Sequence, residues 1–185
     1  MKIIQIGTNR GNDDLTQIIG GNEIEKFIIV EPMSIHNNDI EKCYSHVKNK
    51  IIENVAVSDS DNGSVDFFYH INDGPGYEVS STDINHVLKH GYNSDGIVKI
   101  TVPSVNINTL MTKHGIKNLD LLFIDAEGLD DAIIRSIDFD RFKIDKIYFE
   151  NLHLKSDTHG FLKSVGYDVV NGIGLNGWTS LAQRI

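Results

Sequence analysis

The chain has 185 residues, of which 40% are hydrophobic, and its 17 Lys and Arg against 26 Asp and Glu give a net charge of −9. This composition is that of one globular domain; it excludes disordered and fibrous classes, and its acidity argues against a nucleic-acid partner. No apolar stretch approaches the roughly 20 residues that span a bilayer, and no targeting segment precedes the first strand, so we expect a cytoplasmic protein without a membrane partner.

The predicted elements alternate short apolar runs with amphipathic segments. Strands are expected at 2–6, 27–30, 51–57, 65–69, 97–102, 119–124, 146–149, 167–170 and 178–185. Helices are expected at 15–19, 34–47, 106–114, 130–137 and 157–165. This alternation predicts an α/β fold with a doubly wound, mostly parallel sheet, and the last two strands, which have no helix between them, should pair antiparallel.

Residues 72–96 interrupt the alternation. They hold four glycines, Pro75 and a Ser80-Ser81-Thr82 run, and only 84–89 has a helical pattern. We interpret this segment as an irregular insert in a single domain, 1–185. Long loops of this kind usually carry function or are mobile.

A glycine turn, Gln5-Ile6-Gly7-Thr8-Asn9-Arg10-Gly11, lies between the first strand and the first helix. Glycines there allow a tight turn and a close approach to a ligand, and the following helix N-terminus favours negative groups. The same glycines also suit an ordinary strand–helix turn, and the dinucleotide spacing G-x-G-x-x-G is missing. This motif alone leaves the two readings open.

Acidic residues follow the next two strands. Glu31, in Val30-Glu31-Pro32, lies about twenty residues after the glycine turn, the distance at which a carboxylate accepts from ribose hydroxyls. Asp59, after Ser58, could accept from an adenine amino group, or it could simply begin the turn 60–63.

Two more strand ends carry acids. Asp125 and Glu127 follow the most apolar strand, and Glu150 and His153 follow the next. Because parallel strands end at one edge, Asp125, Glu150 and His153 could converge as acid–base groups that deprotonate a hydroxyl. They could also bind a metal, but nothing fixes a ligand geometry, so we predict none. The other histidines, such as His36, His46 and His114, are expected on helix surfaces.

Taken in order, these motifs resemble the FkbM-type methyltransferases, a branch of the class I methyltransferase fold. The resemblance implies a seven-stranded Rossmann-like sheet and S-adenosyl-L-methionine as cofactor. It also implies methyl transfer to a hydroxyl, often on a sugar or a small metabolite, so that the partner is a small-molecule or glycan acceptor. The residues that it places at the cofactor are Gln5, Gly7, Thr8, Asn9, Gly11, Glu31, Pro32, Ser58, Asp59, Asp125 and Glu127.

The chain departs from that family at Gln5, where most members have an acid, and it has almost no N-terminal extension. The insert must therefore recognise the acceptor, or a partner chain in a homo-oligomer must help. Two alternatives follow. One is a non-catalytic cofactor-binding or scaffold protein of the same fold, and the other is a nicotinamide oxidoreductase, which the glycine spacing and the antiparallel last strand disfavour.

Overall fold

The computed structural model describes residues 1–185 except 12–14, 153, 155–156 and 174–176. Its main sheet has seven strands, which are, from one edge to the other, β3 (Lys50–Glu53), β2 (Lys26–Val30), β1 (Lys2–Ile6), β7 (Asn118–Ile124), β8 (Lys143–Glu150), β10 (Thr179–Arg184) and β9 (Tyr167–Ile173). The first five run parallel, and β10 lies antiparallel to both of its neighbours. The predicted doubly wound sheet with an antiparallel last strand is confirmed.

Alternation along the central strands builds two cores. On β1, Ile4 and Ile6 belong to the core on one face, whereas Ile3 belongs to the core on the other. Residues 27–30 of β2 and 121–124 of β7 follow the same alternation, which is why these stretches are apolar throughout. Because both faces are covered, the central strands are rigidly held and their ends are fixed in position.

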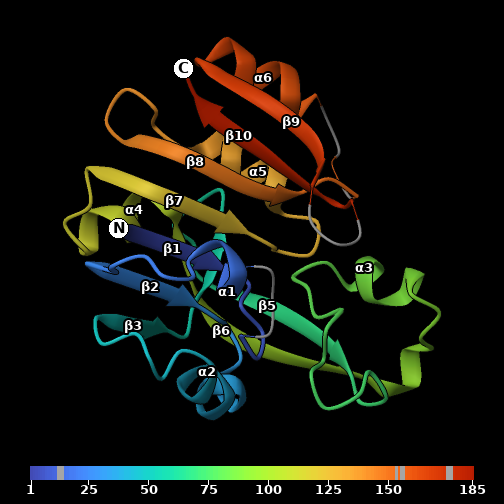
Figure 1. Ribbon diagram of the computed structural model, residues 1–185. Coiled ribbons are helices and arrows are strands. Elements are labelled where there is room, and N and C mark those ends of the chain that lie inside the picture. The colour runs from blue at the N-terminus through green and yellow to red at the C-terminus, as the bar shows by residue number, and fades with distance from the viewer. Residues whose placement is uncertain (12–14, 153, 155–156, 174–176) are drawn as a thin grey trace.

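Short helices cover the two faces (Figure 1). One face is covered by α4 (Ile107–Lys113), α5 (Asp130–Ser136) and α6 (Thr158–Ser164). The other is covered by α1 (Leu15–Ile18) and by α2 (Asn37–Cys43), which the 3-10 turn η1 (Ser34–His36) precedes. Among the described residues, no helix has the length and hydrophobicity needed to cross a membrane.

A second, three-stranded sheet was not predicted. It consists of β4 (Ala56–Ser58), β6 (Ile97–Asn106) and β5 (Gly63–His70), with β6 in the middle. The insert follows β5 and contains α3 (Ile84–Lys89), as expected, and the turn η2 (Ser94–Gly96). Figure 1 shows β5, β6 and α3 projecting to one side of the main sheet.

The expectation of one strand over 51–57 is wrong, because the chain changes sheet at Asn54. The Asn54 side-chain amide donates to the carbonyl of Glu31 (2.8 Å) and to Asn37 (2.9 Å). This side chain takes the place of the next backbone donor of β3, so pairing with β2 ends there. The following residues then pair with β6 instead.

The strand order reverses direction at β1, which lies between β2 and β7. At such a switch point the connections leave to opposite faces and open a crevice beyond the carboxyl ends of the strands, where ligands bind in open α/β sheets. The loops at 7–11, 31–36 and 125–129 all begin at this crevice.

Candidate functional site

A cavity of about 500 Å³ lies at this switch point. This volume is typical of small-molecule and cofactor sites. Its lining comes from the ends of β1 and β2, the loops after β1, β2, β3 and β7, the strands β4 and β5, and the insert. The lining residues are Ile6, Gly7, Thr8, Asn9, Arg10, Val30, Glu31, Pro32, Met33, His36, Val55, Ala56, Val57, Phe67, Tyr77, Glu78, Ser80, Thr82, Asp125, Ala126, Glu127 and Leu129.

The glycine turn forms one wall of the cavity. Gly7 has a φ of +76°, and a Cβ at this position would overlap the backbone carbonyl of Asp125, so only glycine allows the turn to pass the end of β7. Asn9, with a φ of +49°, donates its side-chain amide to the carbonyl of Gly76 at 2.9 Å. The turn is therefore fixed to the main sheet on one side and to the insert on the other.

Glu31, at the end of β2, is 5% exposed. One carboxylate oxygen accepts the backbone N–H of Asn9 (2.8 Å) and the other accepts that of Met33 (2.9 Å). Burial raises its pKa to about 7 in spite of these hydrogen bonds. The carboxylate is thus held in one orientation at the cavity wall, with lone pairs left for hydroxyl donors.

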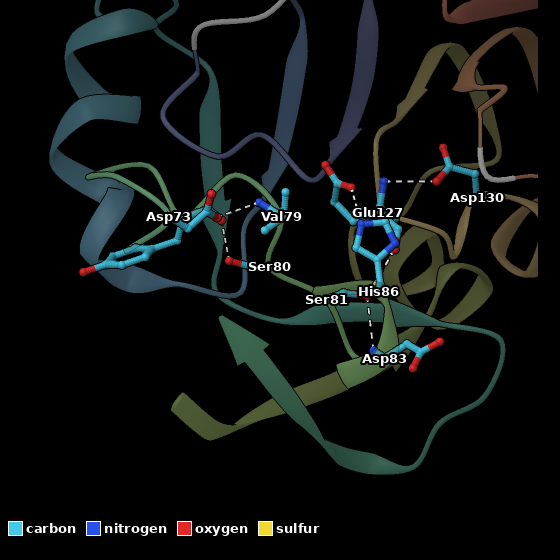
Figure 2. A network of polar contacts seen from close by, with 10 residues as sticks. Asp73, Val79, Ser80, Ser81, Asp83, His86, Glu127 and Asp130 are labelled. Carbon is cyan, nitrogen blue, oxygen red and sulfur yellow. Dashed lines mark hydrogen bonds and ion pairs between the residues drawn. The ribbon is translucent and has the colours of Figure 1, made fainter. Parts of the chain in front are cut away.

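The loop after β7 is joined to the insert (Figure 2). Glu127 has a φ of +47°, and its carboxylate lies 2.8 Å from the Nε2 atom of His86 on α3. The hydroxyl of Ser81 donates to the Glu127 carbonyl at 3.1 Å. The insert therefore closes the side of the cavity that faces β7.

Asp130 and Glu150 lie behind this loop. The buried carboxylate of Asp130 accepts the backbone N–H groups of Ala126 (3.2 Å) and Glu150 (3.1 Å), and so joins the ends of β7 and β8. Burial raises the pKa of Asp130 to about 6, and burial together with the charges of Glu127 and Asp130 raises that of Glu150 to about 7. The Oε2 atom of Glu150 is buried and has no hydrogen-bond partner among the described residues.

The structure brings together seven of the predicted site residues in the cavity lining: Gly7, Thr8, Asn9, Glu31, Pro32, Asp125 and Glu127. The remaining described ones lie outside that lining: Gln5, Gly11, Ser58, Asp59 and Glu150. His153 lies outside the described residues.

Four of the residues outside the lining, Gln5, Gly11, Ser58 and Asp59, make contacts elsewhere in the protein. Gln5 is fully buried and its side-chain oxygen accepts from the hydroxyl of Tyr44 at 3.0 Å. A Cβ at Gly11 would press on Cys43 and Tyr44. The Ser58 hydroxyl lies 3.0 Å from that of Ser104. Asp59 is exposed and accepts from the hydroxyl of Ser60 at 3.0 Å.

The expectation that His36 lies on a helix surface is wrong, since it is 3% exposed and lines the cavity. It was missed because it lies in a 3-10 turn, where a helical pattern does not predict which side chains are buried. The contributions of Tyr77, Ser80 and Thr82 were also missed individually. The irregular composition of 72–96 was the one signal for them.

Within the part of the chain that the structure describes, two buried polar atoms of the lining have no hydrogen-bond partner, Oγ1 of Thr8 and Nε2 of His36. Thr8 is 2% exposed. Such atoms are costly unless a ligand or water satisfies them. Together with Glu31 they offer a hydroxyl, an imidazole and a carboxylate in one cavity, which suits a ligand with hydroxyls and a heterocyclic base.

The methyltransferase FkbM domain model matches residues 5–169, which is most of the chain. The chain belongs to this family. Members of the FkbM methyltransferase family use S-adenosylmethionine. The donor set described above, a buried carboxylate and two polar atoms without a partner among the described residues of the same cavity, fits a cofactor that carries hydroxyls and a heterocyclic base.

Solved structures resemble this FkbM-domain chain in fold. A methyltransferase FkbM from Methylobacillus flagellatus KT matches with a TM-score of 0.58 and 12% identity over 98% of this chain, which spans 43% of that protein. A precorrin-6y C5,15-methyltransferase from Geobacter metallireducens GS-15 matches with a TM-score of 0.49 and 13% identity, over 100% of this chain and 80% of that one. None of the curated proteins that were compared matches the sequence.

Proposed function

We propose that this FkbM-domain methyltransferase transfers a methyl group from S-adenosylmethionine to a hydroxyl of a sugar or another small metabolite. The observation that supports it most is Glu31, a buried carboxylate oriented by two backbone N–H groups at the switch-point cavity. When bound, the cofactor supplies an electrophilic methyl group. The protein supplies binding, orientation and a path for the proton.

In this proposal the loops after β1 and β2 hold the cofactor. The Glu31 carboxylate accepts from the ribose hydroxyls, and the Oγ1 atom of Thr8 and the backbone of the glycine turn line the neighbouring wall. Asn9 keeps the turn in place through Glu31 and Gly76. These contacts are made before any acceptor arrives, so the cofactor would meet a preorganised site.

The acceptor hydroxyl must lose its proton as its oxygen forms the new bond to the methyl carbon. The carboxylates of Asp125 and Glu127 line the cavity and can take that proton. Glu150, with a pKa of about 7, lies behind them and can influence proton transfer through its charge. The insert residues Ser80 and Thr82 line the side of the cavity from which an acceptor would enter.

Calorimetric titration with S-adenosylhomocysteine tests cofactor binding. The wild-type protein should bind it, and Glu31→Ala should weaken binding about a hundredfold, because two hydrogen bonds to a charged group are lost. Asp59→Ala is the matched control, since this exposed carboxylate lies outside the cavity lining and its removal should leave binding unchanged. No binding by the wild type, or unchanged binding by Glu31→Ala, would refute the proposal.

Turnover is tested separately with a methyl-labelled cofactor and a panel of hydroxylated sugars and small metabolites. Transfer of the label to a hydroxyl is expected for part of the panel and should fall in Asp125→Asn. Binding of the cofactor with no transfer to any member would favour the non-catalytic alternative.

A further inference from the structure

His36 is a buried side chain with an unused polar atom. It is 3% exposed, lines the switch-point cavity, and its Nε2 atom has no hydrogen-bond partner. Its ring lies 6.5 Å from that of Tyr77, measured between centroids. A buried polar atom without a hydrogen-bond partner destabilises the unliganded protein, so a ligand that pairs with it would bind more tightly.

The cavity lining changes in character along the edge of the sheet. The strands that border the cavity end in the order β3, β2, β1 and β7. Near β3 and β2 the lining is apolar, with Pro32, Met33, Val55, Ala56, Val57 and Phe67. Near β1 and β7 the polar side chains of Thr8, Asn9, Asp125 and Glu127 lie among the apolar Ile6, Ala126 and Leu129. The lining is therefore more apolar on the side of β3 and β2, the apolar compartment, and more polar on the side of β1 and β7, the polar compartment.

Glu31 marks the boundary between these compartments. A nucleoside whose ribose hydroxyls are bound by Glu31 has its base on one side and its 5′ substituent on the other. A purine has apolar faces and polar edges, so it suits the apolar compartment. The charged amino-acid portion of the cofactor suits the polar one. This orientation brings the base to His36, which belongs to the loop that follows Glu31.

The residue that the sequence suggested for the base is differently placed. The Asp59 side chain is exposed and contacts Ser60, and the backbone carbonyl of Asp59 accepts from the Asn106 side chain at 2.9 Å. Asp59 does not line the cavity, whereas His36 does.

We propose that His36 recognises the purine base of the cofactor through a hydrogen bond at Nε2 in the apolar compartment. The inference rests on the proposed function, because it assumes that the nucleoside of S-adenosylmethionine occupies the cavity. His36 is thus a binding residue that determines specificity for the base, and Pro32, Met33 and Val57 provide the apolar contacts around it.

The charge state of His36 agrees with this role. Burial and the neighbouring Arg10 lower its pKa, so the imidazole is neutral at pH 7. A neutral imidazole has one donor and one acceptor nitrogen. Nε2 can therefore accept from an exocyclic amino group or donate to a ring nitrogen, depending on the tautomer.

The experiment compares two ligands on three proteins. S-adenosylhomocysteine carries the base, and S-ribosylhomocysteine is the same ligand without it. Competition calorimetry gives both Kd values for the wild type, for His36→Phe, which keeps an aromatic ring but removes the nitrogens, and for Glu31→Gln. We expect His36→Phe to weaken the binding of S-adenosylhomocysteine about tenfold and the binding of the base-free ligand by less than twofold. Glu31→Gln should weaken both ligands by a similar factor, since both have the ribose.

A second substitution, His36→Gln, restores a donor and an acceptor and should bind S-adenosylhomocysteine within about threefold of the wild type. Thermal melting of each variant establishes that it is folded. Equal weakening of both ligands by His36→Phe, or no weakening, would overturn the assignment of His36 while leaving the proposed function intact. Failure of the wild type to bind S-adenosylhomocysteine would overturn the proposed function itself.

Discussion

At the scale of single residues, three carboxyl groups near the crevice have raised pKa values. Burial raises the pKa to about 7 for Glu31 and Glu150 and to about 6 for Asp130. A folded-state pKa above the unfolded value means that the folded protein binds the proton more tightly. These groups therefore contribute most to stability below pH 4, and the contribution is lost as pH rises through 6 to 7.

The effect of a raised carboxyl pKa on stability can be measured at Glu150. Its Oε2 atom is buried without a partner among the described residues. At high pH, Glu150→Gln therefore removes a poorly solvated negative charge, whereas at low pH the carboxyl group is already protonated and the substitution removes almost no charge. We expect the free energy of unfolding in urea to rise by about 1–2 kcal/mol at pH 8, a value discounted for partial exposure, and to change little at pH 4.5. The exposed Glu23→Gln serves as control. Equal stabilisation at both pH values would show that the charge is not the cause.

Strand geometry decides which of the predicted site residues line the cavity. Glu31 and Asp125 reach the cavity because both directly follow buried parallel strands. Gln5 does not, because side chains alternate along a strand and its side chain accepts from Tyr44 in the core. His36 could not be placed, because the orientation of a 3-10 turn depends on tertiary packing.

At the scale of elements, the insert is connected to several loops of the main sheet, including the loop after β2, where the Ser80 hydroxyl donates to the sulfur of Met33 at 3.7 Å. Near α3, His86 lies against Glu127 and Ser81 donates to the Glu127 carbonyl. On the other side of the cavity, Asn9 donates to Gly76. The insert is therefore held at both ends of the cavity wall, so its position and that of the Glu127 loop should depend on each other.

Removing one of these connections should loosen the insert locally. We expect His86→Ala to increase backbone hydrogen exchange over 80–90 about tenfold, because a buried hydrogen bond to a carboxylate is lost. His90→Ala changes the exposed residue that directly follows α3; it removes the ring contact with His86 but leaves the His86–Glu127 contact, so it is the matched control and should have a smaller effect. Faster exchange throughout the chain would instead indicate global destabilisation.

The helices and strands of the main sheet could be predicted because their apolar patterns are local. The second sheet could not. Its strands β4 and β6 are distant in sequence, and the change of sheet at Asn54 depends on a side-chain contact with the Glu31 carbonyl. The short helix α3 was found within the insert by its pattern, but its contact with Glu127 required the tertiary structure.

At the scale of the whole molecule, the net charge of −9 is reflected in the cavity. Four carboxylates line it, those of Glu31, Glu78, Asp125 and Glu127. Among the described residues of the lining, Arg10 is the one lysine or arginine, and it is paired with Asp39 at 2.8 Å. Both the local and the long-range field therefore disfavour an anionic acceptor.

A matched pair of acceptors tests this electrostatic preference. For a hydroxylated compound that is methylated, we expect the phosphorylated derivative with the same free hydroxyl to have a kcat/KM at least about tenfold lower, because a phosphate must approach several carboxylates in a poorly screened cavity. The difference in kcat/KM between the two acceptors should become smaller in 0.5 M salt, where the Debye length falls to about 4 Å. Glu78→Gln, which removes one exposed charge from the cavity lining, should narrow it as well. A difference that neither salt nor Glu78→Gln changes would mean that shape, not charge, excludes the phosphorylated compound.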